Sequence, residues 1–155
     1  MGVKLGTAAL MLCAAFVVRV NGAPGLRSNG APGLQTPGFD QQTTRDKVYA
    51  KPQATRGAEL YVKHCERCHD PAKVPEGKKP GPPTVGPKFI EVWSDRTLGE
   101  LFGSILNTMP SDGSMTLTPD QTLDLVAHLL QANGFPEGTA PLKNDDAMKT
   151  TVIVK

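Results

Sequence analysis

The stretch Cys65-Glu66-Arg67-Cys68-His69 determines how the rest of this chain is interpreted. Its C-x-x-C-H pattern is typical of the site at which a c-type haem is attached to protein. Two thiols three positions apart share one helical turn, where they can add across the two vinyl groups of a single porphyrin. The adjoining His69 is then placed to bind the iron from the proximal side. The motif predicts one covalent haem c, held by Cys65 and Cys68, with His69 as an axial ligand of the iron.

Two other kinds of site share the C-x-x-C pair. A thioredoxin-like redox pair needs a βαβ context, and a zinc site needs a second pair of Cys or His ligands. The sequence has neither, because Cys13 lies in an apolar N-terminal stretch and the other histidines, His64 and His128, are not at zinc spacing. The motif therefore favours haem attachment.

The N-terminus has the pattern of a secretory signal peptide. Lys4 supplies a positive charge, residues 5–18 are almost continuously apolar, and the small residues Gly22 and Ala23 lie where a signal peptidase would cut. The apolar run is shorter than the roughly 20 residues of a membrane-spanning helix. We expect residues 1–23 to be a cleaved signal, the protein to be periplasmic, and no stable membrane span to be present.

The next segment, residues 24–53, is expected to be a linker. The hexapeptide Asn-Gly-Ala-Pro-Gly-Leu occurs at 21–26 and again at 29–34. Such Gly/Pro density cannot bury enough apolar surface to offset the entropy of ordering the chain.

The charge balance gives no indication of nucleic-acid binding. The full chain has seventeen basic and fifteen acidic residues. Loss of Lys4 and Arg19 with the signal would leave fifteen of each, so the mature chain would lack the basic excess that a nucleic-acid-binding surface needs.

The expected folding unit, residues 54–138, is short enough for an unaided hydrophobic core to be marginal. A buried haem would add a large apolar surface for side chains to pack on. Aromatic residues are few, and no strand-rich stretch precedes the tail. We therefore expect an all-α fold with three main helices plus loops around one covalently bound haem.

Capping patterns locate the three expected helices. The first starts from Thr55 as N-cap, carries the C-x-x-C-H motif and ends at Pro71. The second and third start at Thr97 and Thr118, each with Glu or Gln three positions later, as in a capping box. Asn133, followed by a glycine, ends the third helix.

The C-terminal tail, residues 139–155, is expected to lie outside the folding unit. Residues 150–154 have β-propensity but no partner in a helical domain. We expect a frayed terminus, with strand addition to a partner protein as the alternative.

Residues 55–138 resemble the class I cytochromes c, which are monohaem electron carriers with a small helical fold. Besides the haem motif, Gly57 and Tyr61 are similar to the family's close-packing site between the first and last helices. Residues 81–86, Gly-Pro-x-x-x-Gly, are similar to the loop whose proline, here Pro82, packs by the proximal histidine and whose backbone orients it. The resemblance implies an electron carrier, not an enzyme.

A narrower resemblance is to the cytochromes c of bacterial quinoprotein (PQQ-dependent) dehydrogenases. It rests on residues 89–93, 108–110 and 124–136. It implies a quinoprotein dehydrogenase as electron donor, and a terminal oxidase or another cytochrome as acceptor. Trp93 is expected either to place its indole N–H near a haem propionate or to pack in the core. His128 stands where the family commonly has an aromatic residue packed on the helix crossing.

Met109 is the expected second axial ligand. It follows an amphipathic helix and precedes Pro110, a Met-Pro context similar to that of the family's ligand methionine. Met115, on the same loop, is the alternative. A thioether ligand favours ferrous iron, and an iron with both axial positions filled is suited to outer-sphere electron transfer.

Three hypotheses for function remain open at this point. The leading one is a carrier whose basic residues between positions 61 and 90 either steer an acidic partner to the haem edge or are simply solvated. The second is the haem subunit of a permanent dehydrogenase complex. The third, a haem enzyme or gas sensor, needs an open sixth position on the iron.

Overall fold

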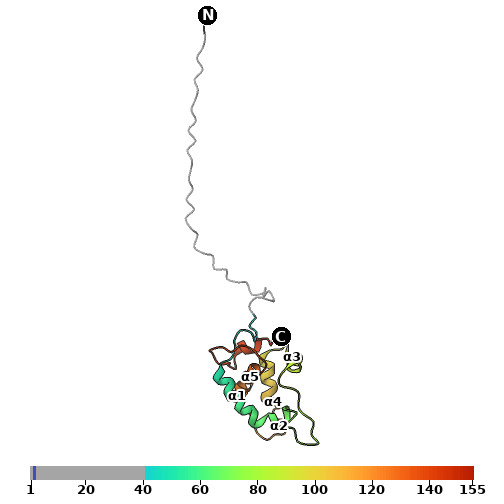
Figure 1. Ribbon diagram of the computed structural model, residues 1–155. Helices are drawn as coiled ribbons and strands as arrows, with labels where there is room; N and C mark the ends of the chain where they lie inside the picture. Colours follow the sequence, from blue (N-terminus) through green and yellow to red (C-terminus); the bar gives the residue numbers. More distant parts are fainter. Residues whose placement is uncertain (1, 3–40) are drawn as a thin grey trace. The chain divides into compact units, whose positions relative to one another are not determined.

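The computed structural model describes Gly2 and residues 41–155, and the latter form an all-α fold without strands, as predicted (Figure 1). The predicted signal peptide, with Cys13, and most of the predicted linker lie outside the described residues. The helices of residues 41–155 are α1 (Lys51–His64), α2 (Glu66–His69), α3 (Pro87–Trp93), α4 (Leu98–Thr108), α5 (Pro119–Ala132) and α6 (Asp146–Thr150).

The three longest helices, α1, α4 and α5, form the frame of the domain, with α5 packed against both of the others. The predicted capping boxes at Thr97 and Thr118 are both present. The end of α5 is also as predicted, because Gly134 adopts a left-handed conformation (φ 79°) that lets the chain leave the helix. Phe135 N–H then donates to Leu130 O at 3.0 Å in a Schellman turn.

The first helix begins five residues before the predicted start. Its N-cap is Ala50, so the prediction of Thr55 as N-cap is wrong. Pro52 lies in the first turn, where its missing N–H needs no partner, and Ala54 is completely buried against the core. The hydroxyl of Thr55 donates to the carbonyl oxygen of Lys51, one helical turn earlier.

Helices α1 and α5 cross in close contact. A β-carbon at Gly57 would lie 1.8 Å from the carbonyl oxygen of Asp124, so only glycine fits. Beside it, the rings of Tyr61 and His128 pack at 5.1 Å between centroids. The close-packing site implied by the family resemblance is thus confirmed, with His128 in the place of the aromatic residue.

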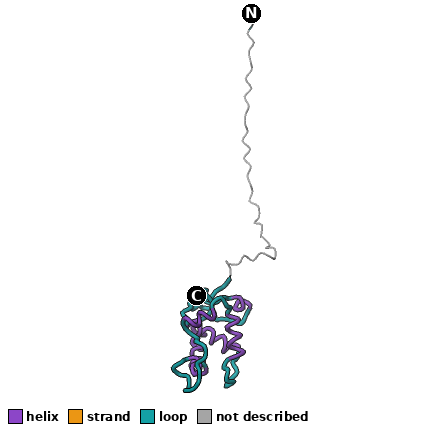
Figure 2. Tube along the Cα trace, turned by 90° about the vertical axis from the view of Figure 1, so that its right-hand side faces the viewer, coloured by secondary structure: helices purple, strands orange, loops and turns teal. Residues whose placement is uncertain are grey.

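The C-terminal tail packs on this frame, and the prediction of a frayed terminus is wrong. Met148 and Ile153 are 2% and 0% exposed. The backbone at Val152 pairs with Thr43 on one side and with Thr97 on the other. The C-terminus consequently lies at the end of the domain where the first described residues enter (Figures 1 and 2). The β-propensity of this segment is satisfied within the chain.

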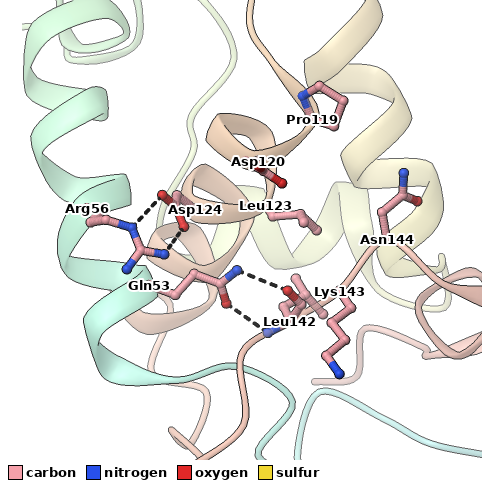
Figure 3. Close-up of a pocket in the computed structure, with 9 residues that line it drawn as sticks. All are labelled: Gln53, Arg56, Pro119, Asp120, Leu123, Asp124, Leu142, Lys143 and Asn144. Atoms are coloured by element: carbon pink, nitrogen blue, oxygen red, sulfur yellow. Dashed lines mark hydrogen bonds and ion pairs between the residues drawn. The ribbon is translucent and has the colours of Figure 1, made fainter.

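Polar contacts also join the tail to the start of α1 (Figure 3). The buried amide of Gln53 donates to the backbone oxygen of Leu142 at 3.0 Å and accepts from its N–H at 2.8 Å. One turn later, Arg56 forms a two-pronged ion pair with Asp124 of α5, at 2.9 and 2.7 Å. The folded unit therefore extends beyond residues 54–138 on both sides.

No helix within residues 41–155 is both long enough and apolar enough to cross a membrane.

Candidate haem site

A cavity of about 360 Å³ lies beside the C-x-x-C-H motif. It is bounded by α2, the loop before α3, and the inner faces of α3, α4 and α5. Its lining includes every site residue expected from the sequence except the alternative ligand Met115: Cys65, Cys68, His69, Pro82, Trp93 and Met109. Side chains that are up to 44 positions apart in the chain are therefore brought to one place by the fold.

Of the two cysteines, Cys65 immediately precedes the short helix α2, and Cys68 lies within it. Cys65 is the residue between α1 and α2, and its carbonyl oxygen accepts hydrogen bonds from the N–H groups of Cys68 and His69, both at 3.0 Å. Burial raises the pKa of the Cys65 thiol to about 11, whereas Cys68 is exposed. Both thiols border the same cavity, as attachment to one porphyrin requires.

His69 is held in one orientation by the proline loop. Its Nδ1 lies 2.8 Å from the carbonyl oxygen of Pro82. Because a carbonyl only accepts hydrogen bonds, Nδ1 carries the proton, and Nε2 keeps the free lone pair that a metal needs. A β-carbon at Gly81 would lie 3.0 Å from the imidazole ring, which explains a glycine at this position.

Met109 enters the cavity at the end of α4. It is the C-cap residue, its N–H donates to Ile105 O at 3.0 Å, and its side chain is half-buried. The residues that follow, from Pro110 to Asp112, continue along the cavity wall, while Met115 is not part of it. Of the two methionines on this loop, Met109 is therefore the one adjacent to the motif's cavity.

The rest of the wall is mainly apolar. One face of α5 is buried against the core and not against the cavity: Leu123, Val126, Ala127 and Leu130. Leu125 and Leu129, on another side of the same helix, line the cavity together with Leu101 and Ile105 of α4. Sequence reasoning missed this second face of α5. A helix apolar on more than one side is the signal that would have revealed it.

A few polar groups interrupt this wall. Tyr61 and Thr84 share a hydrogen bond of 2.5 Å between their hydroxyl oxygens, and His64 also borders the cavity. Trp93 packs against Phe89 with 6.4 Å between ring centroids, and the guanidinium of Arg96 lies 5.3 Å from the indole ring. Trp93 thus combines core packing with a place on the cavity wall.

A second hollow, of about 500 Å³, lies between α1, the start of α5 and the tail (Figure 3). Three of its polar side chains, Gln53, Arg56 and Asp124, are already bonded to protein partners. It has no cysteine, histidine or methionine in its lining, so only the first cavity has the groups that a haem needs.

An apolar cavity with two thiols, an oriented imidazole and a thioether, set in an all-α frame, defines a c-type cytochrome domain. Comparison with protein families agrees, since residues 52–129, about half of the chain, match the family described as cytochrome c oxidase, cbb3-type, subunit III. The chain belongs to this family, and it is an electron-transfer protein with covalently bound haem c. Searches of curated proteins and of solved structures gave no match.

Proposed function

We propose that this protein is a periplasmic carrier of single electrons whose haem c is attached to Cys65 and Cys68 and ligated axially by His69 and Met109. The observation that carries the proposal is the convergence of these four side chains on one cavity. The bound haem supplies an iron that gains and loses one electron. The chain supplies its attachment, its axial ligands and its apolar surroundings.

The fixed orientation of His69 supports this role. The hydrogen bond to Pro82 keeps Nε2 available and makes the imidazole a stronger electron donor to a bound metal. Met109 is the C-cap residue of α4, and the hydrogen bond from its N–H to Ile105 O ties its backbone to the helix. Two ligands held by the fold favour an iron whose coordination stays the same when its charge changes.

A catalytic role has less support in this cavity. A peroxidase-like or gas-binding site needs an open sixth position and, for catalysis, an acid or base beside it. On the Met109 side, the described carboxylate closest along the chain is Asp112, which is paired with Arg67 at 3.7 Å. Besides His69, the histidine that lines the described cavity is His64, which directly precedes the motif in the chain, so the Met109 loop contributes no histidine beside Asp112.

The charges near the cavity support docking of an acidic partner on a smaller patch than the sequence indicated. Three of the six basic residues between positions 61 and 90 form ion pairs within residues 41–155: Arg67 with Asp112, Lys73 with Glu66, and Lys88 with Glu91. Lys78 and Lys79 lie exposed on the loop before α3, and Lys79 borders the cavity. These two lysines are the best candidates for electrostatic steering.

We further propose a quinoprotein dehydrogenase as electron donor and a terminal oxidase or another cytochrome as acceptor. The sequence resemblance supports the donor, and the oxidase in the name of the matched family supports the acceptor.

The alternative is a haem subunit of a permanent dehydrogenase complex. Val85 and Val92, which are 50% and 55% exposed, favour it, because Val92 borders the cavity and Val85 lies on the adjoining loop. The C-terminal tail does not favour a permanent complex, since its backbone is already paired within the domain.

Purification from the native source, followed by reduction kinetics with the dehydrogenase that is found there, separates these functions. A carrier elutes apart from the dehydrogenase and is reduced more slowly as salt is raised. The double variant Lys78→Ala/Lys79→Ala should show a lower rate at low salt, whereas the exposed Lys143→Ala, on the second hollow, should not. Stoichiometric co-elution at high salt would support the permanent subunit, and failure to exchange electrons with any partner would contradict both.

A further inference from the structure

The side chain of Asn133 connects the end of α5 to the loop that holds His69. Its amide nitrogen donates to Thr84 O at 3.0 Å and to Leu129 O at 2.8 Å. Its amide oxygen accepts from Gly86 N–H at 2.9 Å. Both amide hydrogens and the amide oxygen are thus used, which fixes the side chain in one orientation.

These bonds are not needed to end the helix. Gly134 takes the left-handed conformation, and the Schellman turn closes through the N–H groups of Gly134 and Phe135. Asn133 itself has φ −93° and ψ 9°, so it lies outside the left-handed region in which asparagine is favoured. Two of its three side-chain hydrogen bonds run instead to the loop 47 to 49 positions earlier in the chain.

The same loop is held from the opposite helix. The hydroxyl of Tyr61, in α1, bonds the Thr84 hydroxyl at 2.5 Å, so Thr84 is fixed through its side chain by α1 and through its carbonyl by α5. Two residues earlier, the Pro82 carbonyl accepts the Nδ1 proton of His69. Only Pro83 separates Thr84 from Pro82. A shift of Thr84 therefore moves the Pro82 carbonyl that accepts the hydrogen bond of His69.

We propose that Asn133 is a positioning residue for His69, acting through Thr84 and the Pro82 carbonyl. This inference rests on the proposed function in taking His69 as the axial ligand. The Nδ1–H···O bond strengthens electron donation by the imidazole, which stabilises ferric iron. Loosening the loop weakens that bond, so the reduction potential rises when the amide of Asn133 is removed.

The test compares holoprotein carrying Asn133→Ala with wild type and with Asn144→Ala, an exposed asparagine on the second hollow. The measurements are the midpoint potential and the hydrogen exchange of the Gly81 amide, which donates to Cys68 O at 2.7 Å and makes no contact with Asn133. We expect exchange at Gly81 to become about tenfold faster in Asn133→Ala, as for loss of two hydrogen bonds. The amide of Val126, in the interior of α5, should exchange at the wild-type rate, and the potential should rise.

An equal acceleration at Gly81 and Val126, with an unchanged potential, would mean that Asn133 only stabilises the domain, and would overturn the proposal. If Asn133→Ala does not yield folded holoprotein, Tyr61→Phe releases the Thr84 side chain while keeping the ring on His128. In Tyr61→Phe, exchange at Gly81 should then be faster and the midpoint potential higher than in wild type, both by less than expected for Asn133→Ala. Wild-type values of both quantities would overturn the proposal. Failure of the proposed function is distinguishable from failure of this inference. The axial ligands of the wild-type iron are identified from its absorption spectrum, whereas the positioning role of Asn133 is measured by hydrogen exchange.

Discussion

Gly57 of α1 lies so close to Asp124 of α5 that a β-carbon on it would be 1.8 Å from the Asp124 carbonyl oxygen. Backbone cannot move aside as a flexible side chain can, so any larger residue must force the two helices apart. This contact sets the separation of α1 and α5, and with it the position of Tyr61 and of the haem motif that follows α1 in the chain.

Gly57→Ala should therefore lower the free energy of unfolding of the holoprotein by about 3 kcal/mol, the upper range for overpacking a core. The matched control is Gly103→Ala in α4, where the nearest atom to a new β-carbon is Asn107 Nδ2 at 3.9 Å. That change should stabilise by about 0.5–1 kcal/mol, since alanine is the better helix former. Urea unfolding followed by circular dichroism measures both, and equal effects would contradict the close contact.

The buried tail gives a second prediction. Ile153 is fully buried, so Ile153→Ala should cost about 2–5 kcal/mol of unfolding free energy. Val154→Ala, at the half-buried neighbouring position, is the control and should cost less. A frayed terminus would make both substitutions neutral in urea unfolding.

His128 gives a prediction for pH dependence. Burial lowers its pKa below the ordinary value of 6.5, and its Nδ1 is buried without a hydrogen-bond partner among the described residues. The unfolded chain therefore takes up a proton first as pH falls, and stability is lost between the unfolded pKa and the lower folded pKa.

His128→Phe, which keeps a ring against Tyr61, should remove this loss. Unfolding free energies measured at pH 8 and at pH 5 should differ less in the variant than in wild type. His64→Phe is the comparison for a change in histidine content alone. The same pH dependence in His128→Phe and wild type would show that His128 is not its source.

The parts of this fold that depend on neighbouring residues were predictable from the sequence. Capping boxes at Thr97 and Thr118 mark two helix starts because the side chains involved are only three positions apart. The C-x-x-C-H motif is local in the same way. Its chemistry needs only one helical turn.

The parts that depend on distant contacts were not predictable in this way. The N-cap of the first helix is Ala50 and not Thr55, because Gln53 and Ala54, just before Thr55, are buried against the tail and the core. The tail itself is ordered by backbone pairing across more than a hundred positions. Asn133 was identified only as a helix stop, because its bonds to residues 84 and 86 have no trace in the local sequence.

The ferric absorption spectrum of the holoprotein tests the proposed iron site most directly, because a sulfur-to-iron charge-transfer band is present only when a thioether binds the iron. The band should be present in wild type and in Met115→Ala, and absent in Met109→Ala. The reason is that Met109, and not Met115, borders the cavity. A wild-type spectrum without the band, or its loss in Met115→Ala with retention in Met109→Ala, would contradict the His69/Met109 site.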